Sequence, residues 1–316
     1  MLNYKDFMDA LKQAIYETTG WESDYMGSLK DESATSDTTL EIHYMRTDSD
    51  SCTVSIKVPP LFARYQLGEK ITMIAELVVE KIREDDNVCL AEAVVQCKNY
   101  EFAKKRLFVV TESIHNEEAL YQCIHQTVGD IAICPNLKLL DRNGKMIGLK
   151  VAPELLRLWK KSAEEVIKDA LENAPKLYPP RFYDFWKALG METYKGEDFM
   201  QEDQASVLQS GFGDKCISTT IMQHGAAAIF YPGVAKRICQ CMGVKKLYLL
   251  FTSVHEVMVV PVKMELPEEI LKARLKSGSE PLASPKEKLT EEIYCYEEEN
   301  NCIRLLGGEG NVYQCE

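Results

Sequence analysis

Residues 54–64 read VSIKVPPLFAR, and residues 147–157 read IGLKVAPELLR. In both stretches an apolar strand pattern meets a proline, and a helical pattern follows it. The shared pattern Lys-Val-x-Pro keeps one offset of 93 residues, as the step from Pro60 to Pro153 shows. Proline suits the first turn of a helix, because its missing N–H would have no partner there. The two stretches therefore predict the same local structure, a strand that runs into a proline-led helix.

A hairpin precedes each proline in the prediction. Residues 40–45 and 54–58 alternate apolar and polar side chains, and the run between them is rich in turn-forming Asp and Ser. Residues 130–140 and 146–151 enclose Asn143-Gly144, a strong signal for a two-residue hairpin turn. The sequence thus predicts two hairpin–proline–helix units.

Helix starts are marked by capping residues. Asn3 precedes an amphipathic pattern that runs to Thr18, and its side chain can accept a backbone N–H in the first turn. Ser162 and Glu165 have the spacing of a capping box, which predicts a second helix after the one led by Pro153.

A third and weaker copy of the unit is predicted further along the chain. Residues 217–222 and 226–231 are interpreted as its strands, and Pro232 opens a helix that ends at Gly243. Hairpins at 246–263 and 292–306 and a short helix at 267–276 are expected after it.

The expected fold class is therefore α+β, with antiparallel sheets, helices packed on one face, and two lobes. The front lobe, residues 1–190, holds the first two units. The back lobe, residues 191–306, holds the third unit and the last two hairpins, and residues 307–316 are expected to be a flexible tail. The polar segment 194–213 is interpreted as the linker.

Composition limits the class of partner. The chain has 316 residues, of which 46% are hydrophobic and 27% charged, so it can bury a core. Its net charge of −12 would repel a phosphate backbone, and no nucleic-acid partner is expected. The basic runs 104–106 and 245–246 are short and are interpreted as solvated flanks of strands.

The protein is expected to be cytoplasmic, with no membrane segment and no cofactor. The N-terminal apolar pattern is interrupted by charges, and the longest apolar stretch, 247–262, is too short to span a bilayer. The 11 cysteines include no C-x-x-C pair, which favours buried free thiols over disulfides or a metal site.

One turn gathers the residue types of a hydrolase. Ser253, His255 and Glu256 have the chemistry of a nucleophile, a base and an orienting carboxylate, so they form the candidate polar site. Because His255 and Glu256 are adjacent, an extended chain points them to opposite faces. No catalytic residue is therefore assigned.

Several motifs resemble an uncharacterised family of Firmicutes proteins, a domain of unknown function (family 5688), and more remotely the YtpQ-like family of Bacillus-type bacteria. The resemblance lies in VSIKV at 54–58, GDIAI at 129–133, Leu158-Trp159, NAPKLYP at 173–179, Gly225–Ala227, YPGV at 231–234 and SVHEVMVVP at 253–261. Neither family implies an activity.

The sequence favours a non-enzymatic protein-interaction or regulatory module, whose partner is another protein. The alternative is a hydrolase or small-molecule-binding enzyme with a site near His255 and Glu256 between the lobes. The oligomeric state is left open.

Overall fold

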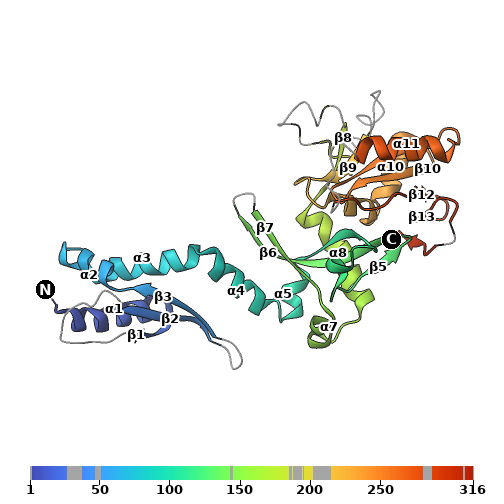
Figure 1. Cartoon of the computed structure of the whole chain (residues 1–316). Helices are drawn as coiled ribbons and strands as arrows, with labels where there is room; N and C mark the ends of the chain where they lie inside the picture. The colour runs from blue at the N-terminus through green and yellow to red at the C-terminus, as the bar shows by residue number, and fades with distance from the viewer. Residues whose placement is uncertain are drawn as a thin grey trace. The chain divides into compact units, whose positions relative to one another are not determined.

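A computed structural model describes residues 2–26, 38–46, 51–142, 145–184, 187, 194, 196–201, 215–279, 287–308 and 310–315. The chain folds into two compact units, which are described separately. Unit 1 consists of Met1–Cys97 and Leu139–Met146, and unit 2 of Lys98–Lys138 and Ile147–Glu316. The α+β class with antiparallel sheets is confirmed (Figure 1). The predicted lobe boundary at residue 190 lies within unit 2.

Unit 1 is a three-stranded sheet, in the order β1-β2-β3, with helices. Its elements are α1 (Tyr4–Thr19), β1 (Glu22–Met26), β2 (Thr39–Arg46), β3 (Ser51–Lys57), α2 (Pro59–Gln66), α3 (Ile71–Glu84) and α4 (Asp86–Gln96). The predicted cap of α1 is confirmed, because the Asn3 side chain accepts the Asp6 backbone N–H at 2.8 Å. Pro59 and Pro60 occupy the first turn of α2, as predicted.

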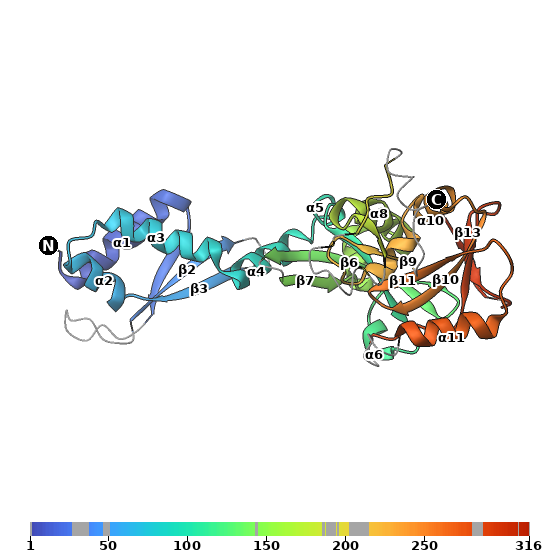
Figure 2. The same cartoon turned by 90° about the horizontal axis from the view of Figure 1, so that it is seen from above.

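The core of unit 1 lies between the sheet and two helices. Helices α1 and α3 lie side by side over the strands (Figure 2). Phe7 and Leu11 of α1 are buried in one cluster with Ile42 of β2 and Ile74 of α3. Alternation along the strands leaves polar groups such as Asp24 on the other face, so this sheet carries its helices on one face.

Unit 2 contains two sheets. Its elements are α5 (Tyr100–Lys104), β4 (Leu107–Ser113), α6 (Glu117–Leu120), β5 (Gln126–Val128), β6 (Ile131–Arg142), β7 (Lys145–Lys150), α7 (Pro153–Trp159), α8 (Ala163–Leu177), β8 (Pro180–Asp184), β9 (Lys215–Thr219), the 3₁₀ helix η3 (Gly225–Phe230), α10 (Val234–Met242), β10 (Lys246–Ser253), β11 (Glu256–Pro261), α11 (Glu268–Ser279), β12 (Tyr294–Glu297), β13 (Cys302–Leu305) and β14 (Tyr313–Gln314). The residues of β6 and β7 between 139 and 146 belong to unit 1.

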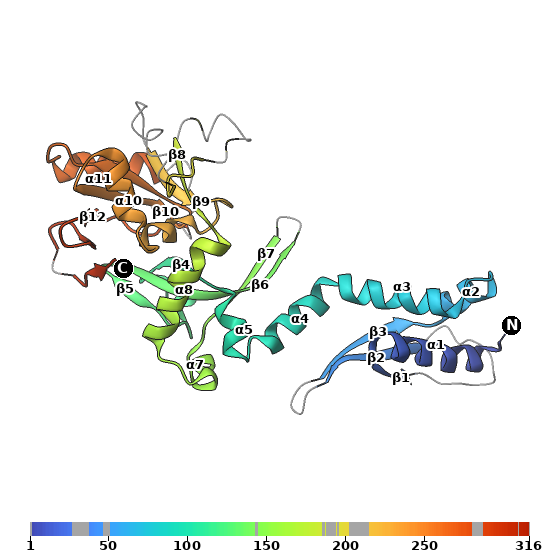
Figure 3. The same ribbon diagram turned by 180° about the vertical axis from the view of Figure 1, so that it is seen from behind.

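The smaller sheet has four strands, in the order β4-β6-β5, with β7 paired to β6. Helix α8 packs against β4 (Figure 3). The predicted capping box is present at its start, where the Ser162 hydroxyl accepts the Glu165 N–H at 3.1 Å and the Glu165 carboxylate accepts the Ser162 N–H at 2.9 Å. Pro153 opens α7 directly after the β6–β7 hairpin, as its counterpart opens α2.

The larger sheet has seven strands, in the order β14-β13-β12-β10-β11-β9-β8. Leu271 of α11 is buried with Tyr248 and Leu250 on one face. On the other face the ring of Phe230 in η3 stacks on Phe251, with ring centroids 5.9 Å apart. Because helices cover both faces, the prediction of helices on one face is wrong for this sheet.

Two further expectations are corrected. Residues 226–231, predicted as a strand, form η3 and its C-cap, so the third hairpin–proline–helix unit is wrong. The run of small residues Ala226–Ala228 is fully buried, and an apolar run of that length does not distinguish a strand from a tight helix. Part of the expected flexible tail forms β14, and the Tyr313 hydroxyl donates to the Phe230 carbonyl at 2.8 Å.

Some expectations fall outside the described residues. They are the turn Asn143-Gly144, most of the turn at 47–51 and most of the linker at 194–213. Within the described ranges, no helix combines the length and the apolar character that a membrane crossing requires.

Candidate functional site

The turn between β10 and β11 carries the three residues of the candidate polar site. Ser253 ends β10 and pairs with Glu256 at the start of β11, after an irregularity in the register. The Ser253 hydroxyl accepts the His255 backbone N–H at 3.0 Å. That contact is typical of a hydroxyl that fixes its own turn, and it directs the oxygen toward backbone.

Glu256 is held by its own hairpin. The Thr252 hydroxyl lies 3.2 Å from the Glu256 side-chain oxygen Oε1 and 3.3 Å from its backbone carbonyl. Burial raises the pKa of Glu256, while the Thr252 hydroxyl and the charge of His255 oppose the shift.

The His255 ring instead contacts two residues that are distant in sequence. Its Nδ1 lies 3.1 Å from the backbone N–H of His224, and its Nε2 lies 3.3 Å from Oε1 of Glu287. Since Nδ1 accepts a hydrogen bond, the ring proton sits on Nε2 and points to the carboxylate. Both ring nitrogens are thus engaged by protein groups.

His224 forms the other side of this cluster in an uncommon conformation. Its backbone is left-handed, with φ of 50° and ψ of 27°, and its ring centroid lies 5.7 Å from that of His255. Nδ1 of His224 is buried and has no hydrogen-bond partner among the described residues. Burial lowers the pKa of His224, with the neighbouring His255 and Lys150 adding to the shift and Glu287 opposing it.

Gly225 fixes the approach of this loop to the sheet. A Cβ atom there would lie 2.1 Å from the Ser218 hydroxyl and 2.6 Å from the His255 carbonyl oxygen. That hydroxyl donates to the same carbonyl at 2.7 Å. Only glycine leaves room for these contacts, because the Cβ atom of any other residue would overlap with them.

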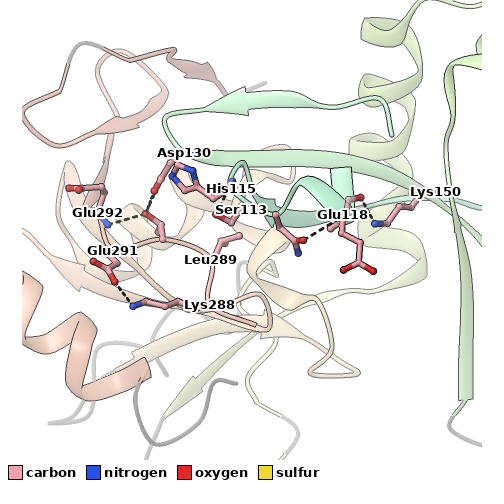
Figure 4. A pocket seen from close by; sticks show the side chains of 12 residues that line it. Ser113, His115, Glu118, Asp130, Lys150, Lys288, Leu289, Glu291 and Glu292 are labelled. Carbon is pink, nitrogen blue, oxygen red and sulfur yellow. Dashed lines mark hydrogen bonds and ion pairs between the residues drawn. The ribbon is translucent and has the colours of Figure 1, made fainter. Parts of the chain in front are cut away.

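A polar pocket of about 870 Å³ opens in unit 2, and Lys150 lies in its wall (Figure 4). The charge of Lys150 also reaches His224, so the histidine cluster and the pocket share an electrostatic environment. The lining residues are Ser113, His115, Asn116, Glu118, Ala119, Asp130, Lys150 and the segment Lys288–Glu292.

The pocket carries both signs of charge. Figure 4 shows Lys150 beside Glu118 and, away from them, Lys288 beside Glu291. Lys150 donates to the backbone carbonyl of Ala119, and Lys288 forms an ion pair with Glu291. An ammonium group has three N–H donors, so each lysine keeps donors beyond these contacts.

Asp130 joins the two segments that form the walls. The Thr290 hydroxyl lies 2.8 Å from Oδ1 and 2.7 Å from Oδ2 of Asp130, and the Asp130 N–H donates to the Tyr294 hydroxyl at 2.9 Å. Gly129 has φ of +56°, and a Cβ atom there would lie 2.4 Å from the same hydroxyl. The turn Gly129-Asp130 is therefore built around Tyr294.

The basic runs are engaged by neighbouring groups. The Lys104 ammonium lies 2.8 Å from an Asp169 oxygen, and the Lys246 ammonium lies 3.4 Å from Oε1 of Glu297. The Arg106 guanidinium lies 4.6 Å from the centre of the Phe102 ring. In the two basic runs, Lys104 and Lys246 are thus paired with carboxylates, and Arg106 lies against an aromatic ring.

Sequence reasoning brought Ser253, His255 and Glu256 to one turn, and the structure places them there. It missed the two partners of His255, because His224 and Glu287 lie 31 and 32 residues away and no spacing pattern links them. The pocket was missed for the same reason. Within the described part of the chain, no group of three or more His, Cys, Asp or Glu side chains is placed to hold a metal ion.

Comparison with known families gives one match. A model described as a family of unknown function (DUF5688) matches residues 4–298, which is most of the chain. Neither the curated proteins nor the solved structures give a match. The match confirms the resemblance to this family, while the Firmicutes origin and the YtpQ-like relationship stay predictions.

Proposed function

The chain belongs to the family of unknown function DUF5688, and from this premise we propose that it is a non-enzymatic regulatory module whose unit 2 binds a small zwitterionic molecule. The observation that carries the proposal is the pocket beside Lys150, in which charges of both signs are held in place by the fold. Its volume of about 870 Å³ suits a small ligand.

The ligand class follows from the unused bonding capacity of the walls. Lys150 and Lys288 keep N–H donors that a carboxylate would accept. Glu118 is exposed in the pocket wall and would accept a ligand ammonium. An amino acid or a short peptide carries both groups, so it would satisfy both signs of charge at once.

Binding is favoured over hydrolysis by the state of the candidate polar site. Ser253 accepts from backbone, and both ring nitrogens of His255 have protein partners. A general base needs a free ring nitrogen within reach of the proton that it removes. These three contacts support a scaffold role for the hairpin.

A hydrolase remains the second candidate, because the contact between His255 and Glu287 is a histidine–carboxylate pair of the kind that orients a catalytic base. In that reading Glu287 replaces Glu256 as the orienting carboxylate. Turnover of model esters or peptides that is lost in His255→Gln would support this candidate.

The cellular setting is part of the proposal. Nine of the ten described cysteines are buried free thiols, which suits a reducing cytoplasm. The net charge of −12 favours a protein partner over nucleic acid. The hairpin–proline–helix pattern shared by residues 54–64 and 147–157 supports an internal repeat.

Thermal unfolding of the full chain tests the ligand site. Amino acids and dipeptides are compared with their N-acetylated, C-amidated forms, which lack both charges. A ligand at 100 times its Kd stabilises the folded state by about 2.7 kcal/mol. We expect a higher Tm with the free zwitterions only, and loss of that shift in Lys150→Met.

Lys168→Met is the matched control, because Lys168 lies on α8, outside the pocket lining. Equal shifts with capped and free ligands, or no shift with any of them, would contradict the proposal.

A further inference from the structure

Unit 1 contains a groove of its own, which lies between helix α1 and strand β1. Its volume is about 390 Å³, and it is lined by Asp9, Lys12, Gln13 and Tyr16 of α1 and by residues 21–24, where β1 begins. The helical residues follow the spacing i, i+3, i+4 and i+7, so they form one stripe along α1. Every lining residue belongs to unit 1, and the groove is therefore complete within that unit.

Strand β1 is the outer strand of its sheet. It pairs with β2 along one side, and none of the described strands pairs with its other side. Every second residue of an edge strand directs its backbone N–H and C=O away from the sheet, where another extended chain can bind them. The groove follows this edge, because consecutive residues of β1 line it although their side chains point to opposite faces. An extended peptide laid in the groove would thus continue the sheet by one strand.

The walls of the groove carry more negative than positive charge. Among the described residues that line it, Asp9, Glu22 and Asp24 supply carboxylates, and Lys12 supplies an ammonium group. The Lys12 ammonium lies 3.5 Å from Oδ1 of Asp24, and Nε2 of His43 lies 3.6 Å from Oδ2 of the same side chain. Asp9 is exposed on the opposite wall. This excess of carboxylates favours a basic peptide over an acidic one.

A buried hydroxyl lies at the centre of the groove. Ser23 is 6% exposed between the exposed Glu22 and Asp24, so its side chain points to the α1 side of β1. Its Oγ atom has no hydrogen-bond partner within the described part of the chain. A buried hydroxyl without a partner costs free energy, which an N–H group of a ligand would recover. Tyr16 and Trp21 add apolar surface for the stem of a long basic side chain.

We propose that this groove binds an extended basic peptide of a partner protein. The peptide backbone pairs with the outer edge of β1, and a lysine or arginine side chain enters the groove. Its charge then lies beside Asp9, and its N–H groups donate to the Ser23 hydroxyl. A second copy of β1 is a poor occupant, because it would bring Glu22 and Asp24 against like charges. The groove lies in unit 1, so this binding is independent of the ligand pocket in unit 2.

Fluorescence anisotropy of short labelled peptides, titrated with the full chain, tests this binding. The basic peptide alternates valine with lysine, so that it can extend along β1. The acidic control has glutamate in place of each lysine. A second control keeps the lysines but carries a methyl group on every backbone amide, which removes the N–H donors that strand pairing needs. At about 0.15 M salt, where the Debye length is about 8 Å, we expect only the first peptide to bind.

Other outcomes would overturn the proposal. Equal binding of the N-methylated peptide would show that charge alone attracts the peptide, without strand pairing. Equally tight binding of free arginine amide would assign the groove to small cations. Self-association of the chain that displaces the peptide would assign the edge of β1 to a second copy. Failure of the basic peptide to bind would leave the groove without the proposed partner.

Substitutions in the groove locate the binding site. Asp9→Asn should weaken binding of the basic peptide about two- to fivefold, as expected for one exposed ion pair. Asp6→Asn is the matched control and should bind like the wild type, because it makes the same change of charge on α1 outside the groove lining. Equal effects of the two variants would place the peptide elsewhere.

Ser23→Ala separates a binding role of the hydroxyl from a structural one. We expect binding of the basic peptide to weaken about tenfold. The Tm should not fall, since the hydroxyl has no partner to lose among the described residues. A lower Tm with unchanged binding would contradict the role of Ser23. The peptide controls on the wild-type chain keep the binding testable if a variant fails to fold.

Discussion

The Tyr294 hydroxyl accepts the backbone N–H of Asp130 at 2.9 Å, across 164 residues of sequence. The same hydroxyl lies against two acceptors, Oδ1 of Asp130 and, at 3.0 Å, the Val128 carbonyl oxygen. Tyr294 belongs to the seven-stranded sheet and Asp130 to the turn before β6, so one phenol connects the two sheets of unit 2.

Replacing Tyr294 with Phe should therefore destabilise unit 2. The substitution leaves the Asp130 N–H and the Val128 carbonyl without this partner, and an unsatisfied buried group costs about 1–3 kcal/mol. Denaturant unfolding measures the loss, and Tyr16→Phe, at a side chain that is 53% exposed, is the control. Equal stability of the two variants would contradict the connecting role of Tyr294.

Gly225→Ala tests the close contact between the His224 loop and the β10–β11 turn. The added methyl would meet the Ser218 hydroxyl and the His255 carbonyl at 2.1 and 2.6 Å, so we expect a loss of about 3 kcal/mol from overpacking. At Gly148 a Cβ atom would meet its nearest neighbour at 3.5 Å, and Gly148→Ala should change stability little. The free energies of unfolding of the two variants are compared with that of the wild type, and equal losses in both would contradict the close contact at Gly225.

The buried ring of His224 predicts a stability that falls in acid. Its pKa is lowered by burial in the folded state, so the unfolded chain binds the proton more tightly. The folded state then loses stability as the pH falls below about 6.5, the ordinary pKa of histidine. His224→Asn introduces a residue that also tolerates the left-handed backbone. The free energy of unfolding of this variant should change less between pH 7.5 and 5.5 than that of the wild type.

His115→Asn is the control for that experiment, since His115 is exposed in the same unit. A pH profile of His224→Asn that matches the wild type would show that the ring is not desolvated as the structure describes.

The buried Glu256 side chain predicts the opposite dependence of stability on pH. Burial raises its pKa in the folded state, so stability is lost as the pH rises from about 4.5 through that raised value. Glu256→Gln removes the buried charge and keeps an oxygen for the Thr252 hydroxyl. We expect the variant to be more stable than wild type at pH 8, with the difference shrinking toward pH 4. A variant that is less stable at pH 8 would refute this explanation.

Unit 1 has a core of its own, and Phe7→Ala should act on it alone. The Phe7 side chain of α1 is fully buried in the core of unit 1, against the rings of Phe62 and Tyr65 of α2, and truncating a buried Phe costs about 3–5 kcal/mol. Hydrogen exchange should show faster exchange of amides within residues 2–97, with β10 and β11 unchanged. Leu67→Ala, at a side chain that is 89% exposed, should change neither region.

The sequence predicted those parts of the fold that local chemistry decides. Asn3, the pair Ser162–Glu165 and Gly243 mark helix ends through contacts within one turn, and each is found where it was expected. The two prolines Pro60 and Pro153 also open helices as predicted. Local signals are sufficient at these helix ends because each capping residue lies within a few residues of the backbone group that it contacts.

The candidate site needed information that local patterns do not contain. The turn that carries His255 was predicted, but its contact with Glu287 depends on how β10 and the segment before β12 come together. η3 was missed because all of its residues, Gly225–Phe230, are buried, and a short apolar run does not distinguish a strand from a tight helix.

The order of strands in the large sheet bears on how shortened versions of this protein would behave. The family match ends at residue 298, directly after β12, whereas β13 and β14 lie beyond it and continue the sheet. A chain cut there would leave unpaired those backbone N–H and C=O groups of Tyr294–Glu297 that face β13, while the groups that face β10 stay paired. Such an open strand edge is a template for self-association. Recombinant versions trimmed to the family boundary should accordingly aggregate, and those that keep residues through 315 should not.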